Sequence, residues 1–464
     1  MLAEQITSLG PALTGYLGSF RSCLGECRLM DHFRTYCRGL LSDLQRKSVE
    51  PIALAAGSTV RALQMFLTDR VWDHLRLRDR LQQRVAALHA PVPGVPRAPD
   101  DLGVIGLIDE TSVAKKGDQT PGVQRQWCGS LGKVENCVVT VHLGYAHGPF
   151  KTLLDGELYL PQSWAKDRER CRRAGIPDAL PYRPKTAIAV AEVQRALGNG
   201  LHFDWLVFDE GYGKDPSFLF ALDALGQTWI GEVPKNFRCW PVLPKYQSLR
   251  REFASKQVYN VVRWGLPFLG QKWRTVVCPR QTAAPTVWQV KAAPVYLVDH
   301  GRPTDRAYWL MVGWNQVTGE YKYFVSNAPP RTSRDLLLHV AFRRAEVEHL
   351  FRVGKDEVGL DHFEGRSYVG LLRHMILCQL ILLFLAEQTA RLNAPQATVP
   401  AWPAADSVAV SAAATRGKKT AGPQADGDIP SLPPPPTVDR DSDPTACHDG
   451  TDGVLPELAL CPLA

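Results

Sequence analysis

The spacing of hydrophobic residues changes along the chain. Residues 31–46 and 59–67 repeat their apolar side chains at helical spacing, and SVEP at 48–51 is typical of a helix start. Farther on, residues 104–109 and 205–209 are short runs of Val, Ile, Leu and Phe that each end in an aspartate. The pattern predicts an N-terminal helical region followed by a region of mixed helices and strands.

The segments around the two aspartate-ended runs predict how those strands lie. Residues 126–132 and 138–144 read as two further strands, which would form an antiparallel meander with the first. Helices are predicted over 164–174 and 185–196, before the strand at 205–209. A strand, helix and strand in this order imply a crossover that places the second aspartate beside the first.

A β-rich insertion is predicted over residues 235–325. Residues 257–277, 286–298 and 308–326 alternate in the manner of strands and are rich in Trp, Tyr and Val. The insertion contains Trp264, Trp273, Trp288 and Trp309. Aromatic residues in strands usually belong to the core, although one of these four is also a candidate to stack on an unpaired base.

Composition marks the boundaries between these regions. A linker with four prolines, APVPGVPRAPD, covers 90–100, and from Asn393 onward Ala, Pro, Ser and Asp dominate, as in disordered segments. The predicted organisation is a helical domain at 1–95, an α/β core at 96–234 and 326–392 interrupted by the insertion at 235–325, and a disordered tail at 393–464. A final helix at 370–391 is expected to be buried, because its most apolar part is too short to span a bilayer.

The segment FRRAEVEHLFRVGK at 342–355 predicts an amphipathic helix. Ala345, Val347, Leu350 and Phe351 form its apolar stripe. A second row holds Arg344, Glu348 and Lys355, at intervals of four and seven. Taken alone, this row is a surface ladder of ion pairs.

Two upstream aspartates change that interpretation. Asp109 and Asp209 end strands that would lie side by side, and Glu348 adds a third carboxylate from a helix. Converging carboxylates repel one another unless a cation lies among them, and hard oxygen ligands suit Mg²⁺ or Mn²⁺.

Three neighbouring glutamates are excluded as ligands. Glu110 and Glu210 follow the aspartates directly, so they point to the opposite face of an extended segment. Glu346 lies about 200° around the helix from Glu348 and is not expected to reach the metal.

Several stretches together resemble a known family. They are LLSDLQRKSVEPIALAAG (40–57), LQMFLTDRVWDHLRLRD (63–79), IDETSVAKKG (108–117), QRQWCGSLGKVENCVV (124–139), WLVFDEGYG (205–213) and GLDHFEGRSYVGLLRH (359–374). With Asp, Asp and Glu in order and the pattern R-x3-E-x6-K, the chain resembles the DDE transposases of bacterial insertion sequences, in particular the cut-and-paste group with a β-rich insertion. One departure is Ala341, because relatives often carry Tyr three residues before the arginine.

The resemblance implies a fold and a chemistry. The fold would be an α/β ribonuclease H-like mixed sheet flanked by helices. Asp109, Asp209 and Glu348 would hold two Mg²⁺ or Mn²⁺ ions, and Arg344 and Lys355 would hold phosphates. The partners would be the terminal inverted repeats and target sites of double-stranded DNA, bound by a homodimer. Lys355 has an alternative role, since it can simply pair with Glu348 or Asp356.

Five further residues are candidate DNA contacts. Lys115 and Lys116 lie in a polar loop over 110–122, and Lys133 lies in the next turn; each can follow a phosphate backbone or belong to a solvated tip. Arg61 and Gln64 would lie on the second helix of a helix-turn-helix, in which Ser58 can cap that helix. A helical bundle used only for packing is the alternative.

Charge and cysteine content agree with a DNA-acting protein of the bacterial cytoplasm. The formal charge is +7, and from Pro395 onward four Lys and Arg stand against nine Asp and Glu, so the remainder is more basic than the whole. The eleven cysteines show no zinc spacing and are expected to be reduced core thiols. Two rivals remain open: a domesticated nuclease, and a DNA-binding regulator that has lost catalysis.

Overall fold

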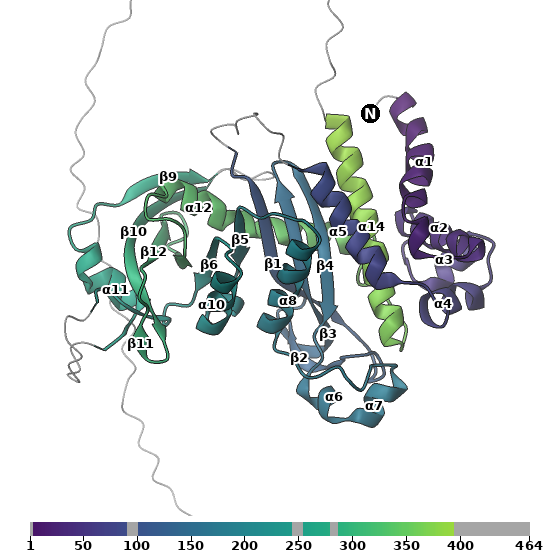
Figure 1. Cartoon of the computed structure of the whole chain (residues 1–464), viewed down its shortest axis with the longest axis horizontal. Helices are drawn as coiled ribbons and strands as arrows, with labels where there is room; N and C mark the ends of the chain where they lie inside the picture. The colour runs from purple at the N-terminus through teal and green to yellow at the C-terminus, as the bar shows by residue number, and fades with distance from the viewer. Residues whose placement is uncertain (1–2, 91–100, 244–253, 279–285, 394–464) are drawn as a thin grey trace, which may run out of the picture. The chain divides into compact units, whose positions relative to one another are not determined.

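Helices form the N-terminal part of the protein. The computed structural model describes residues 3–90, 101–243, 254–278 and 286–393, all within one compact unit (Figure 1). Five α-helices precede the first strand: α1 (Ala3–Gly18), α2 (Cys27–Leu41), α3 (Val49–Ala55), α4 (Val60–Thr68) and α5 (His74–Leu88). The α4 helix is capped by Thr59, whose side chain accepts a hydrogen bond from Ala62 N, so Ser58 is not the cap. The predicted linker, from residue 91, and the predicted tail, from residue 394, lie outside the described residues.

A mixed sheet forms the centre of the fold. Its strands are β1 (Val104–Ala114), β2 (Gln124–Cys128), β3 (Lys133–His147), β4 (Phe150–Leu158), β5 (Trp205–Phe208) and β6 (Trp229–Val233). The β3 strand is antiparallel to β1, β2 and β4, whereas β5 is parallel to both β1 and β6. This is the ribonuclease H-like arrangement, so the predicted fold class is confirmed.

The crossover from the meander to β5 runs through three helices. They are α6 (Gln162–Lys166), α7 (Arg168–Arg173) and α8 (Lys185–Gly198). The single helix predicted over 164–174 is wrong, because Asp167 ends α6 and accepts a hydrogen bond from Arg170 N to cap α7. The β4 strand, which pairs antiparallel with β3 and is mostly buried, was not predicted.

Close approach between β5 and β6 depends on one glycine. Gly231 lies opposite Phe208, and a Cβ atom on Gly231 would stand 1.9 Å from the Phe208 ring. Only glycine leaves room for this ring, which is 1% exposed and immediately precedes Asp209. The ring therefore fixes the end of β5, where the second aspartate begins.

The insertion extends the sheet beyond β6. Its longer strands are β9 (Arg274–Cys278), β10 (Thr286–Asp299), β12 (Tyr308–Asn315) and β13 (Tyr321–Ser326), and β13 pairs antiparallel with β6. The prediction of strand over 257–277 is wrong for α11 (Val258–Trp264), where Val258, Val261 and Val262 are buried at helical spacing. Of the four tryptophans, Trp288 is 3% exposed and Trp264 is 66% exposed.

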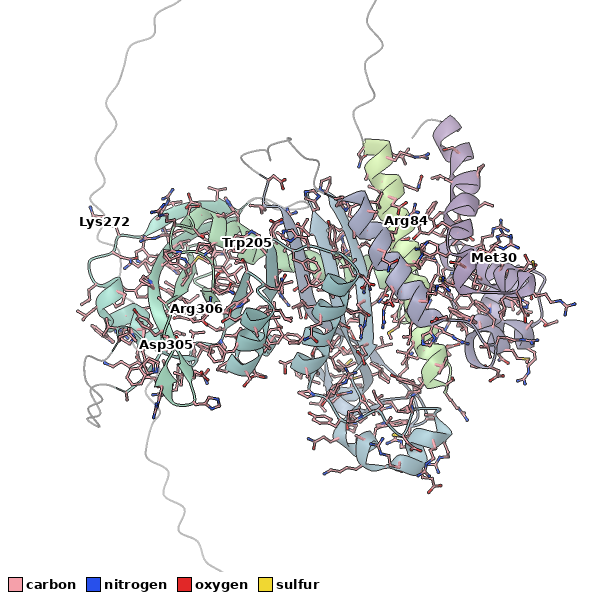
Figure 2. All side chains as sticks on the ribbon, viewed as in Figure 1. Met30, Arg84, Trp205, Lys272, Asp305 and Arg306 are labelled. Carbon is pink, nitrogen blue, oxygen red and sulfur yellow. The ribbon has the colours of Figure 1, made fainter. Side chains whose placement is uncertain are left out.

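The last helix, α14 (Tyr368–Asn393), packs on β4 and on the N-terminal helices. Among the described residues it alone is long and apolar enough to cross a membrane, but 78% of its most apolar window is buried in the protein. Figure 2 shows Arg84 of α5 beside α14, where its Nε lies 2.6 Å from a Glu387 carboxylate oxygen. The prediction of a buried helix is confirmed.

The described cysteines are free thiols, and all but Cys27 are buried. The prediction of reduced core thiols holds for these residues.

Candidate active site

Asp109 lies in the middle of a strand and not at its end. β1 continues five residues past it to Ala114, because Thr111 and Ser112 are buried and pair with β3. The predicted polar loop over 110–122 is therefore wrong in its first part. Asp109 is 6% exposed, and its Oδ1 accepts a hydrogen bond from Glu110 N at 2.7 Å.

Burial and the neighbouring charges shift the pKa of Asp109 in opposite directions. Burial raises the pKa of the Asp109 carboxyl to about 7, against the opposing effect of the Arg344 guanidinium. The neighbouring Asp209 carboxylate raises this pKa further. A carboxyl whose pKa is raised in this way is common at sites that bind a cation or a proton.

Asp209 directly follows β5 and caps the short helix α9 (Glu210–Gly213). Its Oδ1 accepts hydrogen bonds from Gly211 N and Tyr212 N, at 2.9 and 3.3 Å. Because Ile108 of β1 pairs with Phe208 of β5 in parallel, Asp109 and Asp209 each follow one member of a directly paired couple and lie next to each other. The sequence prediction that they lie side by side is supported by this register.

The helix that carries Glu348 is interrupted. The segment consists of α12 (Arg334–Phe342), a 3₁₀ turn η4 (Arg343–Ala345) and α13 (Glu346–Asp356). The continuous helix predicted over 342–355 is therefore wrong at its start, and Ala345 is exposed and lies outside the apolar stripe. Val347, Leu350 and Phe351 are buried as predicted.

Arg344 joins all three predicted carboxylates. Its Nη2 lies 3.0 Å from Asp109 Oδ2 and 3.7 Å from Asp209 Oδ2, while its Nη1 lies 3.0 Å from Glu348 Oε1. The Arg344 side chain is 23% exposed, and that of Glu348 is 63% exposed. The structure thus brings Asp109, Asp209, Glu348 and Arg344 to one place.

The donor atoms at this place suit a hard divalent ion, but their present arrangement does not hold one. Within the described ranges, no group of three or more His, Cys, Asp or Glu side chains is positioned to hold a metal ion. The guanidinium of Arg344 lies between the carboxylates instead. Asp109, Asp209 and Glu348 all offer carboxylate oxygens, the ligands that Mg²⁺ and Mn²⁺ prefer, so the donor chemistry fits such an ion.

Two of the excluded glutamates pair with basic side chains outside the cluster of Asp109, Asp209 and Glu348. Glu110 accepts a hydrogen bond from Lys185 Nζ at 2.6 Å. Glu346 lies 3.3 Å from Lys151 Nζ and 3.0 Å from Arg343 Nη1, and its side chain is 11% exposed. Both contacts agree with the prediction that these carboxylates face away from the site.

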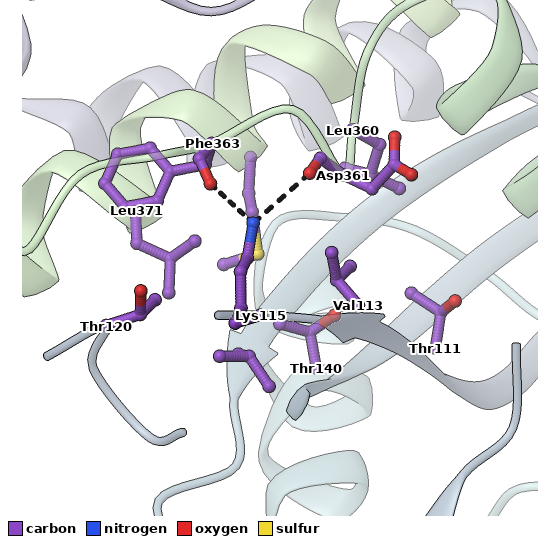
Figure 3. Close-up of a pocket in the computed structure, with 11 residues that line it drawn as sticks. Thr111, Val113, Lys115, Thr120, Thr140, Leu360, Asp361, Phe363 and Leu371 are labelled. Atoms are coloured by element: carbon purple, nitrogen blue, oxygen red, sulfur yellow. Dashed lines mark hydrogen bonds between the residues drawn. The ribbon is translucent and has the colours of Figure 1, made fainter. Parts of the chain in front are cut away.

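Two lysines predicted as DNA contacts bond to the protein's own backbone. Lys355 Nζ donates to Ser112 O at 3.3 Å. Lys115 Nζ donates to Phe363 O at 2.5 Å and to Asp361 O at 3.3 Å, beneath the segment that follows α13 (Figure 3). The Lys115 ammonium therefore has a structural role, which the sequence pattern did not predict.

The remaining predicted contacts lie away from the carboxylates or on the surface. Lys116 is exposed, and Lys133 pairs with Glu135 at 3.4 Å. Arg61 and Gln64 are exposed on α4, which packs against α14 and the other N-terminal helices. Gln64 lines a pocket between α4 and residues 362–365.

Residues missed by the sequence analysis hold the segment after α13. Lys47 N donates to His362 Nδ1 at 2.9 Å, and Lys47 Nζ donates to the main-chain oxygens of Leu40 and Glu357. His374 of α14 contacts Gly359 O through Nε2 at 2.9 Å. The available signal was the concentration of His, Asp and Gly in GLDHFEGR, which is unusual for a plain connection.

Comparison with known proteins agrees with this geometry. Residues 19–285 match the family model of the DDE superfamily endonucleases, a span that includes Asp109 and Asp209 and ends before Glu348. The chain is also 26% identical over 364 residues to a probable transposase for insertion sequence element IS701 from Microchaete diplosiphon, which covers 76% of this chain and 81% of that protein. The chain belongs to the DDE superfamily of endonucleases, and it is similar to transposases of the insertion-sequence type.

Proposed function

We propose that this protein binds the terminal inverted repeats of a mobile element, cleaves the DNA there, and joins the freed ends to target DNA. The observation that carries the proposal is the convergence of Asp109, Asp209 and Glu348 on a single guanidinium. These carboxylates come from two strands and a helix that are far apart in the sequence. Packing alone gives no reason to gather them.

Asp109, Asp209 and Glu348 would hold the divalent ions, two Mg²⁺ or Mn²⁺, that this superfamily generally uses. When bound, such ions lower the pKa of an attacking water and stabilise the charge on the leaving 3′-oxygen. The rigidity of the aspartates supports this role, since Asp109 lies in a strand paired on both sides and Asp209 is held by two main-chain N–H groups.

Two reactions at one site follow from the chemistry of phosphate esters. In cleavage, a water oxygen bonds to phosphorus and the bond from phosphorus to the 3′-oxygen breaks. The attacking water gives up a proton to solvent, and the leaving 3′-oxygen takes up a proton to become a 3′-hydroxyl. In strand transfer, the freed 3′-hydroxyl attacks a target phosphate in the same manner. Both steps are in-line displacements, so the same carboxylates serve both. Arg344 and the exposed Lys116 and Lys133 are the proposed phosphate contacts.

The other proposed properties follow from this activity. Arg61 and Gln64 on α4 would read the repeats, with α3 and α4 as a helix-turn-helix. A homodimer would hold the two ends of the element, in the bacterial cytoplasm. The domain boundaries near residues 95, 235, 325 and 392 are proposed from the composition and the strand pattern of the sequence.

Cleavage of a duplex that carries a terminal repeat tests the proposal. With Mg²⁺ or Mn²⁺ present, the full-length protein is expected to nick this duplex, and Asp109→Asn, Asp209→Asn and Glu348→Gln are each expected to bring nicking below detection while repeat binding is retained. Glu210→Gln and Glu357→Gln are matched controls, because Glu210 is an exposed acid next to Asp209 and Glu357 is an exposed acid at the opposite end of α13 from Glu348. Nicking that survives all three substitutions would refute the assigned site.

A DNA-binding regulator without catalysis is the second candidate. In such a regulator, the ion pairs of Arg344 with Asp109, Asp209 and Glu348 would serve as a permanent structural link. Repeat binding without metal-dependent nicking in the same assay would support it.

A further inference from the structure

Arg344 takes up the carboxylate oxygens that a metal ion would need. Asp109 Oδ2 receives Arg344 Nη2, and Asp109 Oδ1 already accepts from Glu110 N, so both oxygens of this carboxylate have partners. Glu348 Oε1 receives Arg344 Nη1. The guanidinium therefore takes one oxygen from each of two proposed ligands and approaches the third, Asp209.

The charge on Arg344 cannot be removed by a change in pH. An arginine side chain stays protonated throughout the range in which proteins fold. A divalent ion placed among the same carboxylates would be repelled by this fixed charge and would compete for the same oxygens. Arg344 and the metal are thus alternative occupants of one place.

The contacts of Arg344 are incomplete in a way that indicates a second partner. Its Nε is buried and has no hydrogen-bond partner, although both terminal nitrogens are engaged. A phosphate can accept from Nε and a terminal nitrogen together, in the parallel two-bond geometry that arginine forms with oxyanions. A phosphate would therefore satisfy the donor that the carboxylates leave unpaired.

Arg344 lies outside the regular helices and strands of the site. Arg344 lies in the 3₁₀ turn η4, between α12 and α13, and is not held within a continuous α-helix. Glu348, on the first turn of α13, is the most exposed of the three acids. The proposed exchange therefore involves the side chains of Arg344 and Glu348, which lie outside the strands β1 and β5.

We propose that Arg344 occupies the carboxylate site in the DNA-free protein and passes to a DNA phosphate when substrate binds, so that metal loading depends on DNA. This inference rests on the proposed function, since it takes the three carboxylates as metal ligands. Its consequence is that free protein binds divalent ions weakly and binds them more tightly once DNA is bound.

Calorimetric titration of Mn²⁺ into the full-length protein tests the inference without any measurement of activity. In the absence of DNA, Arg344→Ala is expected to bind Mn²⁺ roughly tenfold or more tightly than the wild type, since one opposing charge at this distance changes ionic equilibria by that order. Arg352→Ala is the matched control. It removes a positive charge from an exposed position of α13 and is expected to leave Mn²⁺ affinity unchanged.

A second titration adds a repeat-containing duplex. Wild-type protein is expected to bind Mn²⁺ more tightly with the duplex than without it, whereas Arg344→Ala is expected to show little difference. Adding Asp109→Asn to Arg344→Ala is expected to abolish the gained affinity. Equal Mn²⁺ affinity in the wild type and Arg344→Ala would overturn the inference, as would gained affinity that survives Asp109→Asn.

Thermal melts keep the test informative if Arg344→Ala folds poorly. Without metal, three uncompensated carboxylates are expected to lower its Tm, and Mn²⁺ is expected to raise the Tm more for Arg344→Ala than for the wild type. Arg344→Lys retains the charge but cannot contact two carboxylates at once. Its Mn²⁺-induced rise in Tm is expected to lie between those of the wild type and Arg344→Ala. Normal nicking with no change in Mn²⁺ affinity would refute the role of Arg344 alone. The expected Mn²⁺ results without nicking would refute the proposed cleavage alone.

Discussion

The side-chain nitrogen of Lys115 donates a hydrogen bond to the main-chain oxygen of Phe363, 2.5 Å away. Lys115 is the first residue after β1, the strand that carries Asp109, and Phe363 lies in the segment after α13, the helix that carries Glu348. A single ammonium thus links the segments that directly follow β1 and α13, the elements that carry the first and third carboxylates (Figure 3). Its neighbour Lys116 points to solvent and offers a direct comparison.

Lys115→Met and Lys116→Met are predicted to have different effects. Lys115→Met removes charged hydrogen bonds to two backbone oxygens, which typically contribute about 1.5–3 kcal/mol, so it is expected to lower the Tm by a few degrees. Lys116→Met is expected to leave the Tm unchanged and to weaken non-specific DNA binding, with the salt dependence reduced by about one ion. Melting curves and binding at several salt concentrations measure both. A reduced salt dependence for Lys115→Met with no loss of Tm would restore its assignment as a DNA contact.

The sequence predicted the positions of the carboxylates better than the elements that carry them. Asp109 and Asp209 follow apolar runs, and parallel pairing of such runs explains why they come together. The break at Arg343–Ala345 was not predicted, because FRRAEVEHL has helical spacing throughout and the 3₁₀ turn depends on tertiary contacts, such as that of Arg343 Nη2 with Gly148 O. The role of Lys115 was missed for a similar reason, since its partners are backbone atoms about 250 residues away and have no sequence signature.

Substitution of Glu346 is predicted to lower the stability of the protein, whereas substitution of Glu348 is predicted to abolish cleavage. Glu346→Gln breaks ion pairs with Lys151 and Arg343 among side chains that are at most one quarter exposed, a loss of about 3 kcal/mol for a buried pair. The Tm is therefore expected to fall, while folded protein still cleaves at a low temperature. Glu348→Gln alters a mostly exposed side chain, so it is expected to keep its Tm and lose cleavage. If Glu346→Gln loses cleavage and Glu348→Gln keeps it, then Glu346 and not Glu348 is the ligand.

Deletion of residues 1–95 is predicted to unfold the protein and not merely to weaken DNA recognition. Arg373 of α14 is 5% exposed and donates from Nη1 to Phe66 O and from Nη2 to Trp72 O, both in the N-terminal part. Without those acceptors a buried charge would lose its partners, which is costly. Expression of residues 96–464 and measurement of soluble yield and circular dichroism would check this. A soluble, cooperatively melting fragment would show that the helical part is an independent domain.

Recognition by α4 is better tested by a point substitution. Arg61→Ala lies on an exposed turn at the start of α4 and is expected to reduce the preference for repeat over scrambled duplex, because the first turns of a recognition helix contact bases. Arg70→Ala, just beyond the end of α4, is the charge-matched control and is expected to keep the preference. Competition gel shifts with the two duplexes are sufficient. An equal, small loss of affinity for both duplexes in both variants would mean that α4 contributes charge only.

Acid is predicted to destabilise the protein below about pH 6.5 through its buried histidines. His374 contacts Tyr36 OH and Gly359 O, and burial lowers the pKa of its imidazole from 6.5 to about 4; burial lowers the pKa of His142 to a similar value. Because the unfolded chain binds protons between these two pKa values and the folded chain does not, stability is fully present above pH 6.5 and is lost as the pH falls toward 4. The difference corresponds to about 3 kcal/mol for each fully buried histidine.

The His374→Asn variant tests this dependence. It is expected to be less stable than the wild type at pH 7.5, since it loses contacts in the core, but to lose less Tm between pH 7.5 and pH 5. His300→Asn is the control, because His300 is 98% exposed at its side chain and has a positive φ of 45°, which asparagine tolerates. This control is expected to follow the wild-type pH dependence. If His374→Asn and the wild type lose equal Tm over that range, His374 titrates normally in the folded protein, and the acid sensitivity has another source.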